Sequence, residues 1–175
     1  TGAHRISDYE RKLVQAGARA ARETGVPLIS HTQEGSCGHD QIDLVTREGV
    51  AADRLVVGHS DGVDDHAYHR SLAERGAFVG FDRFGITLIL PDEVRVKNVL
   101  KLAQAGHIRN ILLSHDSIVC WQGRPVPFGR RYEDVLAMLP DWRPTTILTK
   151  VVPQLRAGGL SEADIATILV ENPRR

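Results

Sequence analysis

The chain has 175 residues, of which 42% are hydrophobic, and its 22 Lys and Arg residues balance its 22 Asp and Glu residues. This is the composition of an ordinary folded domain, and it lacks the basic stripe that nucleic-acid binders usually show. No apolar run reaches the roughly 18 residues that a membrane-spanning helix needs. We therefore expect neither a nucleic acid nor a membrane as a partner.

The two cysteines predict a reducing environment. Cys37 and Cys120 lie far apart and form no CxxC pattern, which favours reduced thiols over a disulfide framework. The chain opens on Thr1 without a signal-peptide pattern. We expect a cytoplasmic protein, and we expect this chain to be a piece of a longer one.

Capping residues and apolar runs predict alternating helices and strands. Ser7 and Glu10 form a capping box ahead of an Ala-rich helix, and Asp40 is expected to cap the second helix. Later helices are expected over 92–105, 146–157 and 161–171, and Ser161 with Asp164 approximates a capping box for the last of them. Short apolar runs predict four strands, over residues 27–31, 54–58, 77–81 and 111–114.

Each predicted strand ends beside residues that can bind a metal or move a proton. These residues are His31, His59, Asp82 with Arg83, and Asp116. Their spacing is close to the roughly 30 residues of one strand, crossover helix and return. Such residues at the carboxyl ends of successive parallel strands are typical of the active site of a (β/α) barrel.

Three of these residues make a candidate metal site. Two imidazoles, from His31 and His59, with the Asp116 carboxylate would suit Zn, Mn, Fe or Co. For any single His, a hydrogen-bonded structural role is the alternative. Arg83 either forms an ion pair with its neighbour Asp82 or contacts the substrate.

The segment 117–145 is too long for a simple connector, so we expect a functional loop. Its aromatic residues Trp121, Phe128 and Trp142 belong either to a core or to the apolar wall of a pocket, and Trp121 is a candidate substrate-pocket residue. The acidic cluster at 61–65 is expected to provide negative charge at a helix N-terminus rather than a second metal site.

These motifs resemble the phosphotriesterase family of the amidohydrolase superfamily, above all its phosphotriesterase-like lactonases and phosphotriesterase-related proteins. The runs that carry the likeness are ARETGVPLISHT, RLVVGHSDGVDD, GAFVGFDRFG, NILLSHD and TILVENPRR. The resemblance implies an α/β protein with a (β/α)8 TIM barrel. Residues 1–175 would supply its last four βα units and C-terminal helices, because a complete barrel needs about 250 residues.

The resemblance also implies a binuclear metal centre. His31 and His59 would bind the more exposed ion, and Asp116 would bind the more buried ion and carry a proton to the leaving group. Zn is the first choice of metal, with Mn, Co and Fe as alternatives. An HxH motif and a carboxylated lysine that bridges the two ions would lie outside this chain. Homodimers are usual in the family.

The implied reaction is hydrolysis by a hydroxide that two metal ions share. Gly62 stands where phosphotriesterases have an Asp, and Arg83 where they have a His, as in lactonases. We therefore expect a small-molecule substrate, a lactone or related carboxylic ester, with phosphotriester hydrolysis as a side activity. Amide hydrolysis and organophosphate hydrolysis on the same centre remain alternatives. So do a metal-free binding homologue and a self-contained doubly wound domain.

Overall fold

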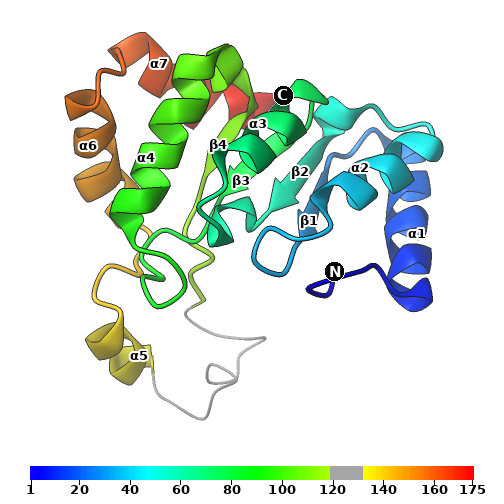
Figure 1. Ribbon diagram of the computed structural model, residues 1–175, viewed down its shortest axis with the longest axis horizontal. Coiled ribbons are helices and arrows are strands. Elements are labelled where there is room, and N and C mark those ends of the chain that lie inside the picture. The colour runs from blue at the N-terminus through cyan, green and yellow to red at the C-terminus, as the bar shows by residue number, and fades with distance from the viewer. Residues whose placement is uncertain (119–131) are drawn as a thin grey trace.

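The computed structural model describes residues 1–118 and 132–175, and within them a parallel sheet forms the centre of the fold (Figure 1). The sheet in this described part has four strands in the order β1-β2-β3-β4, and every neighbouring pair is parallel. The strands are β1 (Leu28–His31), β2 (Leu55–Gly58), β3 (Phe78–Phe81) and β4 (Ile111–Leu113). All four strands lie where the apolar runs predict them.

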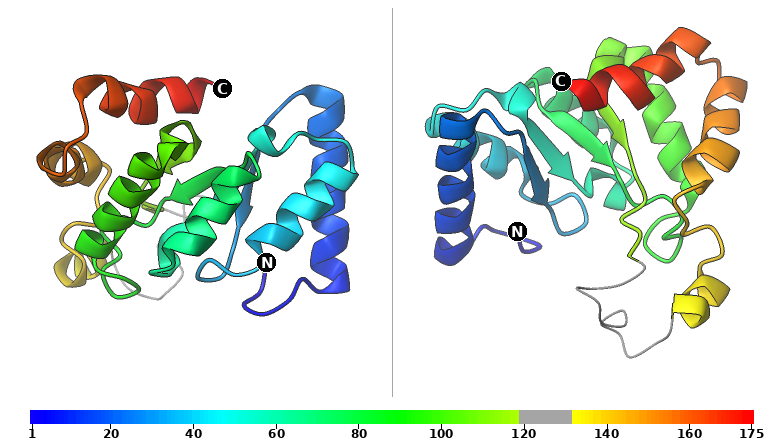
Figure 2. Two further views of the ribbon diagram at one scale, coloured as in Figure 1. Left: turned by 45° about the horizontal axis from the view of Figure 1, so that its top comes forward. Right: turned by 180° about the vertical axis from the view of Figure 1, so that it is seen from behind.

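Helices alternate with these strands. They are α1 (Asp8–Thr24), α2 (Gly38–Arg47), α3 (His66–Glu74), α4 (Asp92–Leu102), α5 (Tyr132–Met138), α6 (Val152–Ala157) and α7 (Glu162–Ala166). Helices α2, α3 and α4 lie on one side of the sheet, and the right-hand view of Figure 2 shows the strands from the other side. A doubly wound sheet carries helices on both faces. Here the strands follow one another in chain order, and the helices between them lie on one side of the sheet. This arrangement instead matches a segment of a barrel. In the described ranges no helix is long and apolar enough to span a membrane.

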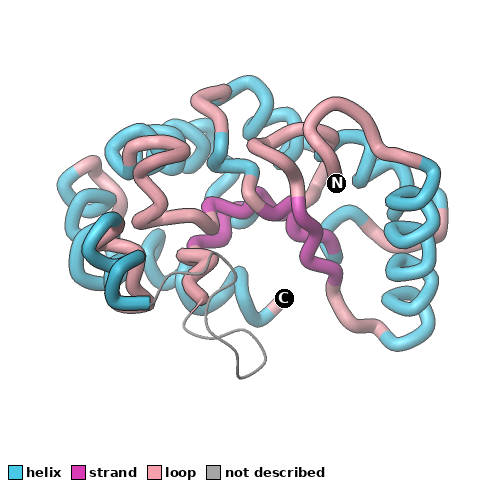
Figure 3. Tube along the Cα trace, turned by 90° about the horizontal axis from the view of Figure 1, so that it is seen from below, coloured by secondary structure: helices cyan, strands magenta, loops and turns pink. Residues whose placement is uncertain are grey.

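The two faces of the sheet differ in burial as a barrel segment requires. Val57, Val79 and Ile111 stand in register on β2, β3 and β4 and are fully buried. Ile29 points to the opposite face of β1 and is 78% exposed. Figure 3, seen from below, shows the sheet curving, with most helices outside the curve and the C-terminal helical segment across its open side. The hydrophobic core therefore lies between the sheet and its helices.

Both predicted capping boxes form. Ser7 Oγ accepts a hydrogen bond from the Glu10 N–H at 3.3 Å, and Glu10 Oε2 accepts one from the Ser7 N–H at 2.9 Å. The same exchange between Ser161 and Asp164 opens α7. Gly25 closes α1 with a φ of 74°, a left-handed conformation that glycine adopts without a steric penalty.

The prediction that Asp40 caps the second helix is wrong. Helix α2 begins at Gly38, after Cys37 with a φ of 60°, and Asp40 lies in the first turn. The Cys37 side chain makes no capping hydrogen bond, so no sequence signal marks this start. A Cβ at Gly38 would lie 2.2 Å from Tyr68 Oη, so close packing against α3 sets where α2 begins.

Candidate active site at the carboxyl ends of the strands

The predicted strand-end residues meet at one edge of the sheet. His31 is the last residue of β1, and His59 follows β2 directly. Asp82 and Arg83 follow β3, and Asp116 lies just beyond β4. Because all four strands are parallel, their carboxyl ends bring these side chains together.

The Asp82 carboxylate sets the orientation of His59. Its Oδ1 accepts hydrogen bonds from the His59 backbone N–H at 2.9 Å and from Nδ1 at 2.8 Å. An ionised carboxylate only accepts, so we assign the ring proton to Nδ1. In the neutral ring, the Nε2 lone pair is then free, and Nε2 lies 4.0 Å from Asp116 Oδ2.

His31 lies against the same imidazole. The two ring centroids are 4.6 Å apart with an interplanar angle of 81°. Burial lowers the pKa of His31, and the nearby His59 lowers it further. His31 is therefore held in the neutral form, which is the form that binds a metal ion.

The backbone is strained at two of the predicted metal ligands. His59 has a φ of 59° and Asp116 a φ of 51°, both in the left-handed region. Within the described ranges, the other non-glycine residues with positive φ are Glu34 and Cys37. Each such residue costs about 1–3 kcal/mol, and such strain concentrates at functional sites. The surrounding contacts hold both side chains at the strand ends despite this cost.

Arg83 forms an ion pair with Asp116 rather than with its neighbour Asp82. Arg83 Nε lies 3.4 Å from Asp116 Oδ2, while the Asp82 carboxylate is occupied by His59. The Arg83 backbone N–H donates to Asp61 Oδ2 at 3.0 Å. Arg83 is thus fixed at both its main chain and its side chain, next to the candidate metal ligand Asp116.

The acidic cluster at 61–65 was expected to provide negative charge at a helix N-terminus, and it does so only in part. Asp65 does cap α3, accepting from the Tyr68 N–H at 2.9 Å. Asp61, however, is buried and lies 2.9 Å from the Nε of the equally buried Arg95. Burial, together with the neighbouring Asp82 carboxylate, raises the pKa of the Asp61 carboxyl to about 6.

A sequence signal for this buried pair exists, although the strand-end pattern does not reveal it. Arg95 and Asn98 share the buried side of α4 with Val99 and Leu102. Polar residues at helical spacing within an apolar stripe need buried partners, because an unpaired buried polar group is costly. The sequence does not say which acidic residues those partners are.

Glycines make room for the Asp82 carboxylate. A Cβ at Gly80 would lie 2.9 Å from Asp82 Oδ2 and 3.0 Å from the Val57 carbonyl oxygen. A Cβ at Gly58 would lie 2.2 Å from the Ser30 carbonyl oxygen. Larger residues here would displace the carboxylate that orients His59.

Gly62, which departs from the phosphotriesterase pattern, lies where a side chain does not fit. A Cβ there would lie 2.8 Å from the Cα of Glu34. The obstacle is backbone, so a rotamer change cannot relieve it. Close approach of the two loops that follow β1 and β2 accounts for the glycine.

An apolar cavity of about 500 Å³ opens beside Arg83 and Asp116. Its walls come from the loop after β3, from the segment after β4 and from the region of α5, namely Ile86, Leu88, Ile89, Ile118, Val135, Met138, Leu139 and Trp142. Trp142 is both buried and part of this wall, and its Nε1 donates to the His115 carbonyl oxygen at 2.7 Å. The candidate pocket residue Trp121 lies outside the described residues, as do Phe128 and Cys120.

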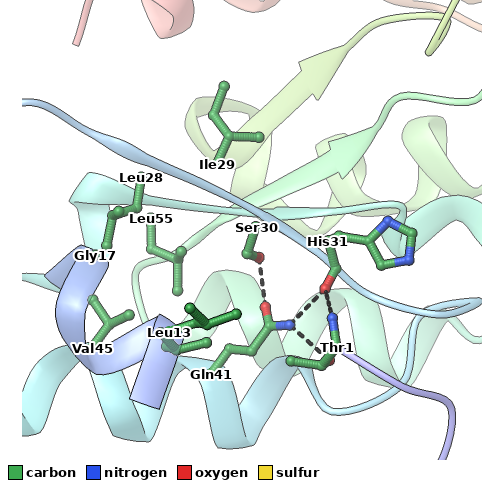
Figure 4. Close-up of a pocket in the computed structure, with 11 residues that line it drawn as sticks. Thr1, Leu13, Gly17, Leu28, Ile29, Ser30, His31, Gln41, Val45 and Leu55 are labelled. Atoms are coloured by element: carbon green, nitrogen blue, oxygen red, sulfur yellow. Dashed lines mark hydrogen bonds between the residues drawn. The ribbon is translucent and has the colours of Figure 1, made fainter. Parts of the chain in front are cut away.

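A second pocket, of about 230 Å³, lies at the free edge of β1 (Figure 4). Its apolar lining includes Leu13, Leu28 and Val45, and Figure 4 shows the His31 ring pointing away from it. Gln41 Nε2 and the Thr1 amino group donate to the His31 carbonyl oxygen at 2.8 and 2.6 Å. These bonds hold the main chain of His31. This pocket is therefore separate from the candidate active site, where His59, Arg83 and Asp116 lie.

The described residues do not form a complete metal site by themselves. Among them, no group of three or more His, Cys, Asp or Glu side chains is arranged to bind an ion. His59 Nε2 and Asp116 Oδ2 nevertheless face each other at 4.0 Å, beside the neutral His31. A lone pair and a carboxylate oxygen at this distance suit a cation, so the donors present fit a metal centre completed by other ligands.

A sequential parallel sheet with polar side chains at its carboxyl edge defines a barrel-type α/β protein. The chain belongs to the phosphotriesterase family, whose sequence pattern matches residues 1–175. The predicted fold class and family are both confirmed.

The alignments with individual relatives include nearly all of this chain. This chain spans only about half the length of each of those relatives. An aryldialkylphosphatase from Saccharolobus solfataricus is 35% identical over an alignment of 173 positions, which covers 97% of this chain and 53% of that protein. An N-acetyltaurine hydrolase from Bos taurus is 29% identical over an alignment of 182 positions, which covers 97% of this chain and 48% of that protein. The solved structure of a mutant of a PTE-like lactonase from Deinococcus radiodurans is 38% identical with a TM-score of 0.87, covering 99% of this chain and 55% of that one.

Proposed function

We propose that the protein is a metal-dependent hydrolase of lactones or related carboxylic esters, with its active site at the carboxyl ends of the strands. The observation that carries this proposal is that Arg83 and Asp116 form an ion pair, that Asp116 faces the candidate ligand His59, and that both residues of the pair line the apolar cavity. A reactive polar edge beside an apolar pocket suits a substrate with a polar ester group and an apolar chain.

The proposed metal centre uses two divalent ions, with Zn as first choice and Mn, Co or Fe as alternatives. His31 and His59 would hold one ion and Asp116 the other, together with an HxH motif and a bridging carboxylated lysine from outside this chain. When bound, such ions activate water and polarise the substrate carbonyl.

Asp116 is the proposed proton carrier. The attacking water loses a proton as its oxygen bonds to the carbonyl carbon, and Asp116 passes this proton to the leaving alkoxide as the ester bond breaks. The Asp116 side chain is 36% exposed, so it can reach a bound substrate. Arg83 would hold the Asp116 carboxylate in place and contact the substrate.

The lactone preference rests on two features. Gly62 and Arg83 match the lactonase form of the motifs, and Gly62 has no room for the Asp of the phosphotriesterases. The wall residue Leu88 is 72% exposed, so it is open to an apolar group of a substrate. The similarity to a PTE-like lactonase supports this choice, and the similarity to an aryldialkylphosphatase supports a phosphotriester side activity.

Amide hydrolysis is the second candidate function. The relative named N-acetyltaurine hydrolase aligns with 97% of this chain, and an N-acyl amide presents the same carbonyl to the proposed site. Its leaving amine needs a proton, which Asp116 would deliver in the same way.

The deciding experiment uses the full-length protein, metal analysis and three substrate classes. We expect about two equivalents of divalent metal and the highest kcat/KM on a lactone, with activity lost on chelation and restored by Zn. Less than about one equivalent would support the metal-free binding homologue. A higher kcat/KM on an aryl dialkyl phosphate or an N-acyl amide would replace the lactone proposal.

We also propose a cytoplasmic homodimer acting on a small molecule. The composition, with 22 basic and 22 acidic residues, supports a protein without nucleic-acid or membrane partners. Light scattering of the full-length protein tests the dimer, for which a monomer mass would be the contrary result.

A further inference from the structure

Arg95, on α4, is a charged side chain with no exposed surface. Its guanidinium lies 2.9 Å from Asp61 Oδ2 and 2.9 Å from Asp92 Oδ1. It also donates to the carbonyl oxygen of Ile86 at 3.2 Å and to that of Leu90. One buried cation thus binds two carboxylates and two main-chain carbonyls.

Both carboxylates also hold the start of the loop that follows β3. Asp61 Oδ2 accepts from the Arg83 N–H at 3.0 Å, and Asp92 Oδ2 accepts from the Gly85 N–H at 3.0 Å. Gly85 has a φ of 90°, and a side chain does not fit there, because a Cβ would lie 2.3 Å from the Asp141 carbonyl oxygen. The loop is therefore bound at its first residues by the carboxylates and at its later residues by Arg95.

Helix α4 holds the preceding loop as well. One turn after Arg95, Asn98 Nδ2 donates to Asp64 Oδ1 at 2.9 Å, and the Asn98 residue is 1% exposed. Asp61 and Asp64 belong to the loop that follows β2 and the candidate ligand His59. Arg95 thus connects the loop beside His59 to the loop that carries Arg83, and Asn98 adds a second contact from α4 to the loop beside His59.

Net stability alone is a weak reason for this arrangement. Desolvating buried charges costs several kcal/mol per ion. The attraction between the charges is of about the same size, so the net contribution to the free energy of unfolding is small. The contacts of Arg95 instead give it a geometric role, because its flat five-donor fork reaches partners in several directions at once. Those partners define where residues 83–91 lie.

We propose that Arg95 is a positioning residue that sets substrate selectivity. By holding the 83–91 loop, it places Arg83 beside Asp116 and fixes the cavity wall formed by Ile86 and Leu88. It never contacts the substrate itself. The inference rests on the proposed function, because selectivity is defined for an ester with an apolar chain.

Lysine and methionine at position 95 separate geometry from charge. Arg95→Lys keeps a cation between Asp61 and Asp92, but its single ammonium cannot span both carboxylates and the Ile86 and Leu90 carbonyls. Arg95→Met keeps the apolar stem and removes the cation, so that the Asp61 and Asp92 carboxylates keep only their main-chain donors. Arg70→Lys is the matched control, because Arg70 forms an exposed ion pair with Glu74 on α3.

The first measurement is amide hydrogen exchange in the full-length protein without substrate. In Arg95→Lys we expect the Arg83 and Gly85 amides to exchange at least about tenfold faster, with unchanged exchange in β2 and β3. Exchange at these amides equal to that of the Arg70→Lys control would overturn the positioning role. If Arg95→Met does not fold, Arg95→Lys and Asp92→Asn carry the same test, since Asp92→Asn weakens only the Gly85 and Arg95 contacts.

The second measurement compares a short-chain with a long-chain lactone. In Arg95→Lys we expect kcat/KM to fall at least about fivefold more for the long-chain than for the short-chain lactone, because the cavity wall moves, whereas a fall in kcat through Arg83 is common to both. An equal loss on both substrates indicates a merely structural role and contradicts the inference. If the wild-type protein hydrolyses neither lactone, the proposed function fails, while the exchange result still decides whether Arg95 holds the loop.

Discussion

A single carboxylate, that of Asp82, holds His59 by two groups, its backbone N–H and its ring Nδ1–H. This arrangement fixes both the position of the imidazole and the nitrogen that faces Asp116. Carboxylates that bind a metal-ligating His in this way orient the ring and raise its basicity. The strained backbone of His59, with its φ of 59°, is kept in place by the same two bonds.

Replacing Asp82 is therefore expected to weaken metal binding without unfolding the protein. In Asp82→Asn the neutral amide accepts less strongly, and we expect metal affinity to fall about 10–100-fold. Competition with a chelator measures it, with Glu74→Gln as the control because Glu74 forms an exposed ion pair. Equal affinities in Asp82→Asn and the control would rule out this role.

Asp116→Asn is expected to lower kcat by about 10²–10⁴-fold, because the amide cannot carry a proton. Its circular dichroism should match the wild type, since the Asp116 side chain is only partly buried. Steady-state kinetics on a lactone, with metal content measured in parallel, check this prediction. A kcat within about threefold of wild type would remove Asp116 from the proton path.

Gly80→Ala is expected to destabilise the protein by about 1–3 kcal/mol, because the added Cβ meets Asp82 Oδ2 at 2.9 Å and the Val57 carbonyl at 3.0 Å. The opposite result is expected for Gly17→Ala within α1, where the Cβ would lie 3.5 Å from Leu28 Cδ2. That substitution should stabilise by about 0.5–1 kcal/mol. Denaturant unfolding measures both, and a stable Gly80→Ala variant would mean that the strand ends relax.

His69 is expected to make stability depend on pH. It is fully buried on α3, its Nε2 lies 2.8 Å from the Ser60 carbonyl oxygen, and burial lowers its pKa. The unfolded chain binds a proton near pH 6.5 and the folded chain resists it, so stability falls as the pH drops below about 6.5. The loss attributable to His69 is up to about 1.4 kcal/mol per pH unit until its folded pKa is reached.

The measurement is urea unfolding between pH 8 and pH 5. In His69→Gln, which keeps an N–H donor for Ser60, we expect a shallower decline than in the wild type. His4→Gln is the control, because His4 is exposed. Parallel declines in the wild type and His69→Gln would show that His69 does not cause the pH dependence.

The helix starts and strands that could be predicted are those marked by residues close together in the sequence. The Ser7–Glu10 and Ser161–Asp164 boxes are read within four consecutive residues, and each strand is a short apolar run between turn residues. Parallel order then places every strand end at one edge, so His31, His59 and Asp116 were expected to meet. The missed start of α2 has the opposite cause, because a contact with α3 determines it.

The sequence by itself determined the alternation of strands and helices, the family, and the polar residues at the strand ends. Only the tertiary structure decided their partners: Asp82 bonds to His59, Arg83 pairs with Asp116, and Arg95 holds Asp61. The reason is physical. Capping and hydrophobic periodicity act between residues a few positions apart, whereas a buried charge is satisfied by whichever opposite charge the folded chain brings within about 3 Å.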